Sequence, residues 1–142
     1  MSAAWWDKAR TALEYCFASG NVAAGSRAGG IVGVFNTPYV AGAYVRNNVA
    51  LHDSISSLDG RRVGFSSGTL SNNYANSAMT VNGGTVSGGE PGNENGADVA
   101  SGAGGYNTQA WWVTGPGFTF NSTSGPWVWD GVKNLPKLYW EE

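Results

Sequence analysis

Few side chains in this 142-residue chain could do chemistry. His52 is the single histidine and Cys16 is the single cysteine. One histidine excludes a paired-histidine metal site, and one cysteine excludes both an internal disulfide and a cysteine-based zinc cluster. We interpret His52 as a turn residue and Cys16 as a small buried hydrophobic residue.

The 10 acidic residues are the remaining candidates for catalysis. Cleavage of a sugar chain needs two carboxyl groups held about 5–10 Å apart, and no acidic pair recurs at a fixed spacing. Glu90, Glu94 and Asp98 share a polar stretch and carry the oxygen ligands that Ca²⁺ prefers, but no calcium-loop pattern surrounds them. The sequence therefore predicts a protein that is not an enzyme, with no metal and no cofactor. A polysaccharide-cleaving enzyme is the least favoured alternative.

The aromatic residues offer a binding chemistry. The chain has 7 Trp, 6 Tyr and 5 Phe, and an exposed Trp can stack its flat apolar face on the C–H groups of a sugar ring. The candidate ligand-binding residues are Trp111, Trp112, Trp127 and Trp129. The competing interpretation is that these rings form a core, because Leu and Ile are scarce. In a strand, adjacent side chains face opposite sides, which predicts that Trp111 or Trp112 is exposed.

Charge and hydropathy exclude two classes of partner. The 8 basic residues are outnumbered by the acidic ones, and no basic stripe could neutralise nucleic-acid phosphates. We interpret Arg61-Arg62 as a solvated turn. No apolar run reaches the length of a membrane helix, so membrane insertion is not expected. Residues 1–8 lack the pattern of a signal peptide, which places any export signal outside this chain.

The sequence predicts short, repeated strands as the elements that position these residues. The segments Tyr15–Ala18, Asn47–Ala50 and Asn72–Ala75 are related, and their final alanines are 32 and 25 residues apart. Short runs rich in Val, Ile, Tyr and Phe lie between clusters of Gly, Asn and Ser, as is typical of strands separated by turns. Stacked repeats would bury the small alanines against one another.

The whole chain, 1–142, reads as a single β-repeat domain with three regions. Repeat coils occupy residues 11–81, a polar loop rich in Gly and Asn occupies 82–108, and a Trp-rich C-terminal cap occupies 109–142. Residues 3–13 favour a short helix, although 11–18 could equally be the first strand. The aromatic cap is expected to close the open hydrophobic end of the repeats.

A resemblance to a known family rests on the first repeat. The run Cys16-Phe17-Ala18-Ser19-Gly20-Asn21-Val22, followed by Gly29-Gly30-Ile31-Val32-Gly33, resembles the GLUG-motif repeats of bacterial surface and adhesin-like proteins. The ending Leu135-Pro136-Lys137-Leu138-Tyr139-Trp140 looks like the terminal unit of such arrays. The second copy lacks the Gly-Gly pair, and the third keeps only its strand. The resemblance implies a β-solenoid on a secreted or surface-attached protein and carries no catalytic residues.

These observations predict an all-β fold, a short right-handed parallel β-solenoid (β-helix) with an aromatic C-terminal cap. The alternative architecture is a β-sandwich. The predicted function is a structural or adhesive module, extracellular or on the cell surface, with glycans or host surface proteins as partners. A carbohydrate-binding module is the alternative. An uncapped first coil would also favour edge-to-edge self-association.

Overall fold

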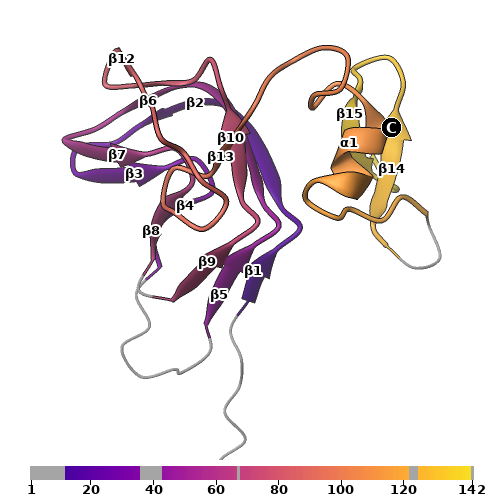
Figure 1. Cartoon of the computed structure of the whole chain (residues 1–142), viewed down its shortest axis with the longest axis horizontal. Coiled ribbons are helices and arrows are strands. Elements are labelled where there is room, and N and C mark those ends of the chain that lie inside the picture. Colours follow the sequence, from indigo (N-terminus) through magenta and orange to yellow (C-terminus); the bar gives the residue numbers. More distant parts are fainter. Residues whose placement is uncertain (1–11, 36–42, 67, 122–124, 142) are drawn as a thin grey trace, which may run out of the picture.

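The chain folds mostly into β-strands with one short helix, as a computed structural model that describes residues 12–35, 43–66, 68–121 and 125–141 (Figure 1). The first repeat holds four strands: β1 (Ala12–Glu14), β2 (Phe17–Ala23), β3 (Arg27–Gly29) and β4 (Val32–Phe35). The second repeat also holds four: β5 (Tyr44–Arg46), β6 (Val49–Ser56), β7 (Asp59–Arg61) and β8 (Gly64–Ser66). The third repeat begins with β9 (Thr69–Ser71), β10 (Tyr74–Asn76) and β11 (Thr80–Val81).

Equivalent strands of successive repeats lie side by side and pair in parallel. The sheets are β1-β5-β9, β3-β7, β4-β8 and a larger sheet in which β6 pairs with both β2 and β10. Ala18 pairs with Ala50, and Ala50 with Ala75, so the repeat alignment predicted from the sequence is confirmed. The all-β class is confirmed too. Parallel pairing between repeats differs from the antiparallel sandwich alternative.

The irregular spacing of the repeats comes from their connections. Residues 36–43 join β4 to β5, whereas only 67–68 join β8 to β9. A register shift between Val32 and Val34 adds one more residue to the first repeat. Together these account for the difference between the spacings of 32 and 25. The strand register survives because insertions in surface connections cost little free energy.

Side chains along the strands of the large sheet point alternately to its two faces, and each face belongs to a different apolar cluster. One face packs small residues inside the repeats, with Ala28, Ala50, Ile55, Ala75 and Met79 as its buried core. The other face carries Val49 and Leu51, which pack against aromatic rings. Adjacent strand residues face opposite sides, so Val49 and Ala50 can serve different clusters.

A ladder of asparagines joins the repeats at the bend between their first two strands. Tyr15, Asn47 and Asn72 occupy this bend with φ of 55°, 58° and 51°. The residue after each bend faces inward. Oδ1 of the buried Asn48 accepts the backbone N–H of Cys16, and Oδ1 of Asn73 accepts that of Asn48. The Asn-Asn pairs therefore satisfy backbone groups that the bend removes from strand pairing.

The polar region 82–108 contains more structure than a loop. Asn82 and Gly83, both with positive φ, form the hairpin turn between β11 and β12 (Gly84–Thr85), as Asn-Gly favours. Further on, β13 (Ala97–Val99) pairs in parallel with β10 and extends the large sheet. The expected loop therefore differs from the structure at Ala97–Val99, where three residues complete a sheet edge.

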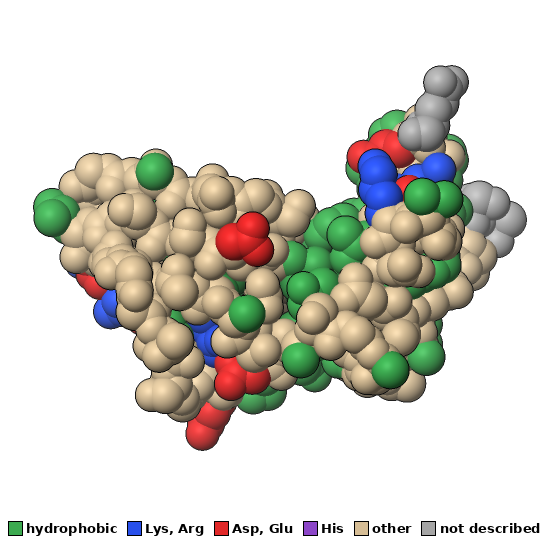
Figure 2. Space-filling view, turned by 90° about the horizontal axis from the view of Figure 1, so that it is seen from above, with side chains coloured by type: hydrophobic (Ala, Val, Ile, Leu, Met, Phe, Trp, Pro, Cys, Tyr) green, Lys and Arg blue, Asp and Glu red, His purple; other side chains and the backbone are tan. Residues whose placement is uncertain are grey.

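The Trp-rich region forms a separate lobe beside the repeats (Figure 1). It comprises α1 (Gln109–Thr114) and the antiparallel hairpin of β14 (Trp127–Asp130) and β15 (Leu135–Leu138). We call residues 109–121 and 125–141 the aromatic module. The buried rings of Trp112 and Phe118 pack on the face of the large sheet through Val49, Leu51 and Val99. The module thus covers one sheet face, and hydrophobic side chains gather at the junction of the two lobes (Figure 2).

Two further predictions concern the ends and the membrane. The short helix expected over 3–13 lies largely outside the described residues, and Ala12–Glu14 is strand β1. Within the described parts of the chain, no helix has the length and apolar character needed to cross a membrane.

Candidate functional site

The predicted ligand-binding tryptophans are brought together as a core. Trp111 and Trp112 lie on α1, not on a strand, with their rings 5.3 Å apart. A helix turns successive side chains by about 100°, so both rings stay on the side that faces the repeats. Trp112 is completely buried, and its Nε1 donates to the carbonyl of Tyr106 at 2.7 Å. Trp111 is half-buried, so the prediction that one of the pair is exposed is wrong.

Trp127 and Trp129 on β14 are half-buried in the same cluster. The Trp127 ring lies 5.4 Å from that of Phe17 and 5.3 Å from that of Phe118. Trp129 meets Phe120 edge-on at 5.9 Å. These contacts support the competing interpretation, in which aromatic rings supply the core that Leu and Ile do not.

Among the described residues, the most exposed aromatic side chains are not the predicted tryptophans. Tyr139 and Trp140 are 57% and 60% exposed and meet edge-on at 4.7 Å. Tyr15 is 40% exposed. Sequence reasoning missed all three as site residues. A signal existed for Tyr15, because it occupies the bend position that is Asn in the two following repeats.

A pocket lies where the first repeat meets the aromatic module. Its volume is about 570 Å³. Its walls come from the bend after β1 and from the segments that flank β14. The lining residues are Glu14, Tyr15, Cys16, Thr119, Gly125, Pro126 and Trp127. Neither the repeats nor the module could form this pocket alone.

The bend conformation of Tyr15 is costly. A left-handed backbone is disfavoured for L-residues by about 1–2 kcal/mol, whereas Asn visits it readily. Asn47 and Asn72 have that conformation at equivalent positions. Tyr15 retains it with its ring edge-on to Phe118 at 6.0 Å. Strained residues of this kind cluster at binding sites.

The electrostatics of the pocket centre on Glu14. Its carboxylate accepts a hydrogen bond from Nε of Arg46 at 2.6 Å. This hydrogen bond, and then the charge of Glu14, raise the pKa of Arg46. Burial, and next the charge of Glu14, raise the pKa of the Cys16 thiol. Cys16 therefore lines the pocket as a neutral thiol at neutral pH.

One donor in the pocket wall lacks an acceptor. The indole Nε1 of Trp127 is buried and has no hydrogen-bond partner among the described residues. An unpaired buried donor costs about 1–3 kcal/mol. Such groups are rare in folded proteins, and each calls for a physical explanation.

His52 is a buried strand residue, so its interpretation as a turn histidine is wrong. It lies on β6 and is 4% exposed. Its Nε2 is 2.6 Å from the carbonyl oxygen of Gly30, and its Nδ1 is 3.2 Å from that of Gly20. The imidazole joins the second repeat to the first, and its tautomer decides which of the two carbonyls accepts the ring N–H.

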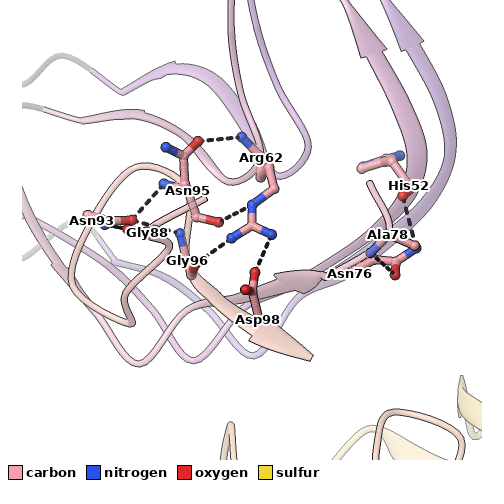
Figure 3. Close-up of polar contacts among 9 residues, drawn as sticks. All are labelled: His52, Arg62, Asn76, Ala78, Gly88, Asn93, Asn95, Gly96 and Asp98. Atoms are coloured by element: carbon pink, nitrogen blue, oxygen red, sulfur yellow. Dashed lines mark hydrogen bonds and ion pairs between the residues drawn. The ribbon is translucent and has the colours of Figure 1, made fainter. Parts of the chain in front are cut away.

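Arg62 is likewise buried, which corrects the prediction of a solvated Arg61-Arg62 turn. Its side chain is 0% exposed, and its guanidinium donates to the carbonyls of Asn95 and Gly96 and to Asp98 at 2.5 Å (Figure 3). Asn93 holds the same loop by accepting from the backbone of Asn95 and Gly96. Arg62 thereby ties the polar loop to the second repeat.

Of the three carboxylates in the polar stretch, two are paired with arginines. Asp98 binds Arg62, Glu94 binds Arg61 at 3.0 Å, and Glu90 is exposed. Over residues 12–35, 43–66, 68–121 and 125–141, no group of three or more His, Cys, Asp or Glu could hold a metal ion. The carboxylates of the described repeats thus serve ion pairs that join neighbouring segments.

Among its described lining residues, the pocket has no activated nucleophile. Cys16 is held as a thiol, and the nearest carboxylate is already paired with Arg46. Comparison with protein families, with curated proteins and with solved structures finds no match for this chain. The function must therefore be argued from the geometry.

Proposed function

We propose that this protein is a non-catalytic structural or adhesive module of a bacterial secreted or cell-surface protein, built as a short right-handed parallel β-solenoid. The resemblance to GLUG-motif repeats suggests this class. The observation that carries it is the register Ala18–Ala50–Ala75, in which each repeat stacks on the one before. Right-handedness is expected because parallel crossover connections are nearly always right-handed.

The internal bonding supports a structural role. The asparagine ladder and the His52 bridge each connect one repeat to the next, and the Arg62 clamp connects the second repeat to the polar loop. These polar groups form bonds within the chain that hold the stack together. A rigid stack of this kind presents its outer faces and loops to a partner, as repeat proteins do.

Adhesion is tested with beads that carry the purified full chain. We expect the beads to bind immobilised host surface glycoproteins or cells, and beads coated with heat-unfolded chain to bind less. Equal binding by folded and unfolded chain would contradict the proposal. So would cleavage of polysaccharides by the purified chain, measured as release of reducing ends.

A carbohydrate-binding module is the second candidate, favoured by the exposed pair Tyr139 and Trp140 and by the aromatic pocket. A glycan array probed with the labelled chain is expected to give specific signals. The variant Trp140→Ala removes the flat exposed platform, and Val132→Ala is the control, because Val132 is 92% exposed on the same hairpin but not aromatic. An array without signals would reject this candidate.

A further inference from the structure

We propose that the pocket lined by Tyr15 and Trp127 is a binding site for one small neutral sugar ring. The proposal rests on the carbohydrate-binding candidate for its class of ligand. It goes further by placing the ligand at the junction, away from the exposed Tyr139–Trp140 pair. None of the tryptophans on α1 lines this pocket.

The size of the pocket suits a small molecule. Ligand sites have volumes of about 300–1,000 Å³ and are lined by aromatic and apolar groups with a few polar ones. The volume of about 570 Å³ lies in this range. The walls come from two lobes, and the interface between structural units is a preferred place for such sites.

The lining matches the two kinds of surface that a sugar ring presents. Tyr15, Pro126 and Trp127 supply apolar faces for ring C–H groups. Glu14 and Thr119 supply a carboxylate and a hydroxyl for ring hydroxyls. A purely apolar ligand would cover the Thr119 hydroxyl and the remaining lone pairs of Glu14 without bonding to them, which costs affinity.

The charge of the pocket favours a neutral ligand. Among the described residues that line the pocket, Glu14 is the one with a charge, and Arg46 neutralises it across a 2.6 Å contact. A cationic ligand would have to compete with Arg46, and an anionic ligand would meet the carboxylate. Neutral hydroxyl groups can instead donate to the free lone pairs of Glu14.

Tyr15, in the pocket wall, has a costly backbone conformation. Tyr15 stands in a left-handed bend where the other repeats have Asn. Backbone strain of this kind clusters at binding sites, which supports a binding role for this wall of the pocket.

Cys16 makes the pocket directly observable, since it lines the cavity and is the chain's single cysteine. The full chain is treated with N-ethylmaleimide at mildly alkaline pH, with and without neutral sugars. The probes are the methyl glycosides of glucose, galactose and mannose, and N-acetylglucosamine. A sugar at ten times its Kd is expected to slow alkylation about tenfold, because only the unoccupied fraction reacts.

The variant Tyr15→Asn separates binding from folding. Asn is the residue that this bend has in the other repeats, so the fold is expected to tolerate it. Protection by the sugar, taken as the ratio of rates with and without it in each variant, is expected to vanish. Tyr139→Asn is the matched control, since Tyr139 is more exposed and does not line the pocket; it should keep full protection.

Each outcome decides the proposal. Protection by a neutral sugar that Tyr15→Asn abolishes supports it. Protection by benzyl alcohol or glucuronate but by no neutral sugar overturns the ligand class. Failure of every probe, the four sugars, benzyl alcohol and glucuronate, to protect Cys16 overturns the site. If the glycan array gives signals that Tyr15→Asn leaves unchanged, the carbohydrate-binding candidate stands and the pocket proposal fails.

Discussion

At the scale of single residues, the buried polar side chains bridge segments that are distant in sequence. His52 meets carbonyl oxygens of Gly20 and Gly30, and Arg62 meets those of Asn95 and Gly96. Buried polar groups are costly unless they are hydrogen-bonded. Each of these residues therefore stabilises the fold only when the segments that carry its partners are correctly positioned.

Arg62→Met is expected to destabilise the protein by about 3 kcal/mol, because it removes the donors for two carbonyls and breaks a pair with one buried partner. Arg61→Met is the matched control. The Arg61 side chain is 34% exposed and its ion pairs lie at the surface, where such pairs contribute about 0–1 kcal/mol. Urea denaturation followed by circular dichroism gives both values. Equal losses in the two variants would contradict the buried-clamp interpretation.

At the scale of elements, short strands depend on what their bends and turns supply. Strands of three residues such as β5 and β10 form few pairs of their own. The asparagine ladder adds bonds between repeats where the strands stop. In the module, the hairpin of β14 and β15 turns through Asn134 with φ of 54°, and Asp130 accepts the backbone N–H groups of Val132 and Lys133.

Asn48→Ala is expected to cost about 2–3 kcal/mol, because it leaves the N–H of Cys16 and the carbonyl of Leu13 without partners. Asn21→Ala is the control. Asn21 is exposed and only accepts from the Ser54 hydroxyl, so its loss should stay within about 0.5 kcal/mol. Thermal and urea unfolding of both variants tests the ladder. A neutral Asn48→Ala would show that water or a neighbour replaces the bonds.

The turn at Asp130 predicts a dependence on pH. Hydrogen bonds from the backbone of Lys133 and then of Val132 lower the pKa of Asp130 in the folded state. Its stabilisation is therefore present above the ordinary Asp pKa of about 3.9 and is lost as pH falls through the lowered folded value. Unfolding of the wild type and Asp130→Asn is compared from neutral to acid pH. The stability difference should shrink in acid, and a constant difference would refute the assignment.

At the scale of the whole molecule, two lobes share one apolar junction. The repeats contribute Val49, Leu51 and Val99, and the module contributes Trp112 and Phe118. The same junction borders the pocket, so its rigidity positions the pocket walls. In the first repeat, β1 to β4 each pair with one strand only among the described residues.

Trp112→Ala is expected to destabilise the protein by about 3–5 kcal/mol, as for other large aromatic truncations in a core. Trp112 is fully buried and lies 4.9 Å from the Phe118 ring. Trp140→Ala, at a 60% exposed position, should change stability by less than about 0.5 kcal/mol. Urea unfolding followed separately by circular dichroism and by Trp fluorescence should give two transitions for Trp112→Ala. A single shared transition at unchanged midpoint would mean that the junction does not couple the lobes.

The sequence by itself determined the β class and the phase of the repeats. Ala18, Ala50 and Ala75 pair as their spacing predicts. Equivalent strands of successive repeats pair in parallel, so residues that repeat in the sequence become neighbours in the stack. Strand β13 was missed, since Ala97-Asp98-Val99 carries too little apolar signal to stand out from a polar stretch.

Only the tertiary structure decided which polar side chains are buried and where the pocket lies. His52 and Arg62 contact backbone carbonyls, which every residue has. The residue types in the sequence therefore give no indication of these contacts. The turn from strand to helix at Trp111-Trp112 likewise depends on the sheet face that the rings cover. Glu14, Tyr15 and Trp127 become neighbours only when the module docks on the repeats. Contacts across more than a hundred residues of chain arise from packing, which local sequence patterns do not encode.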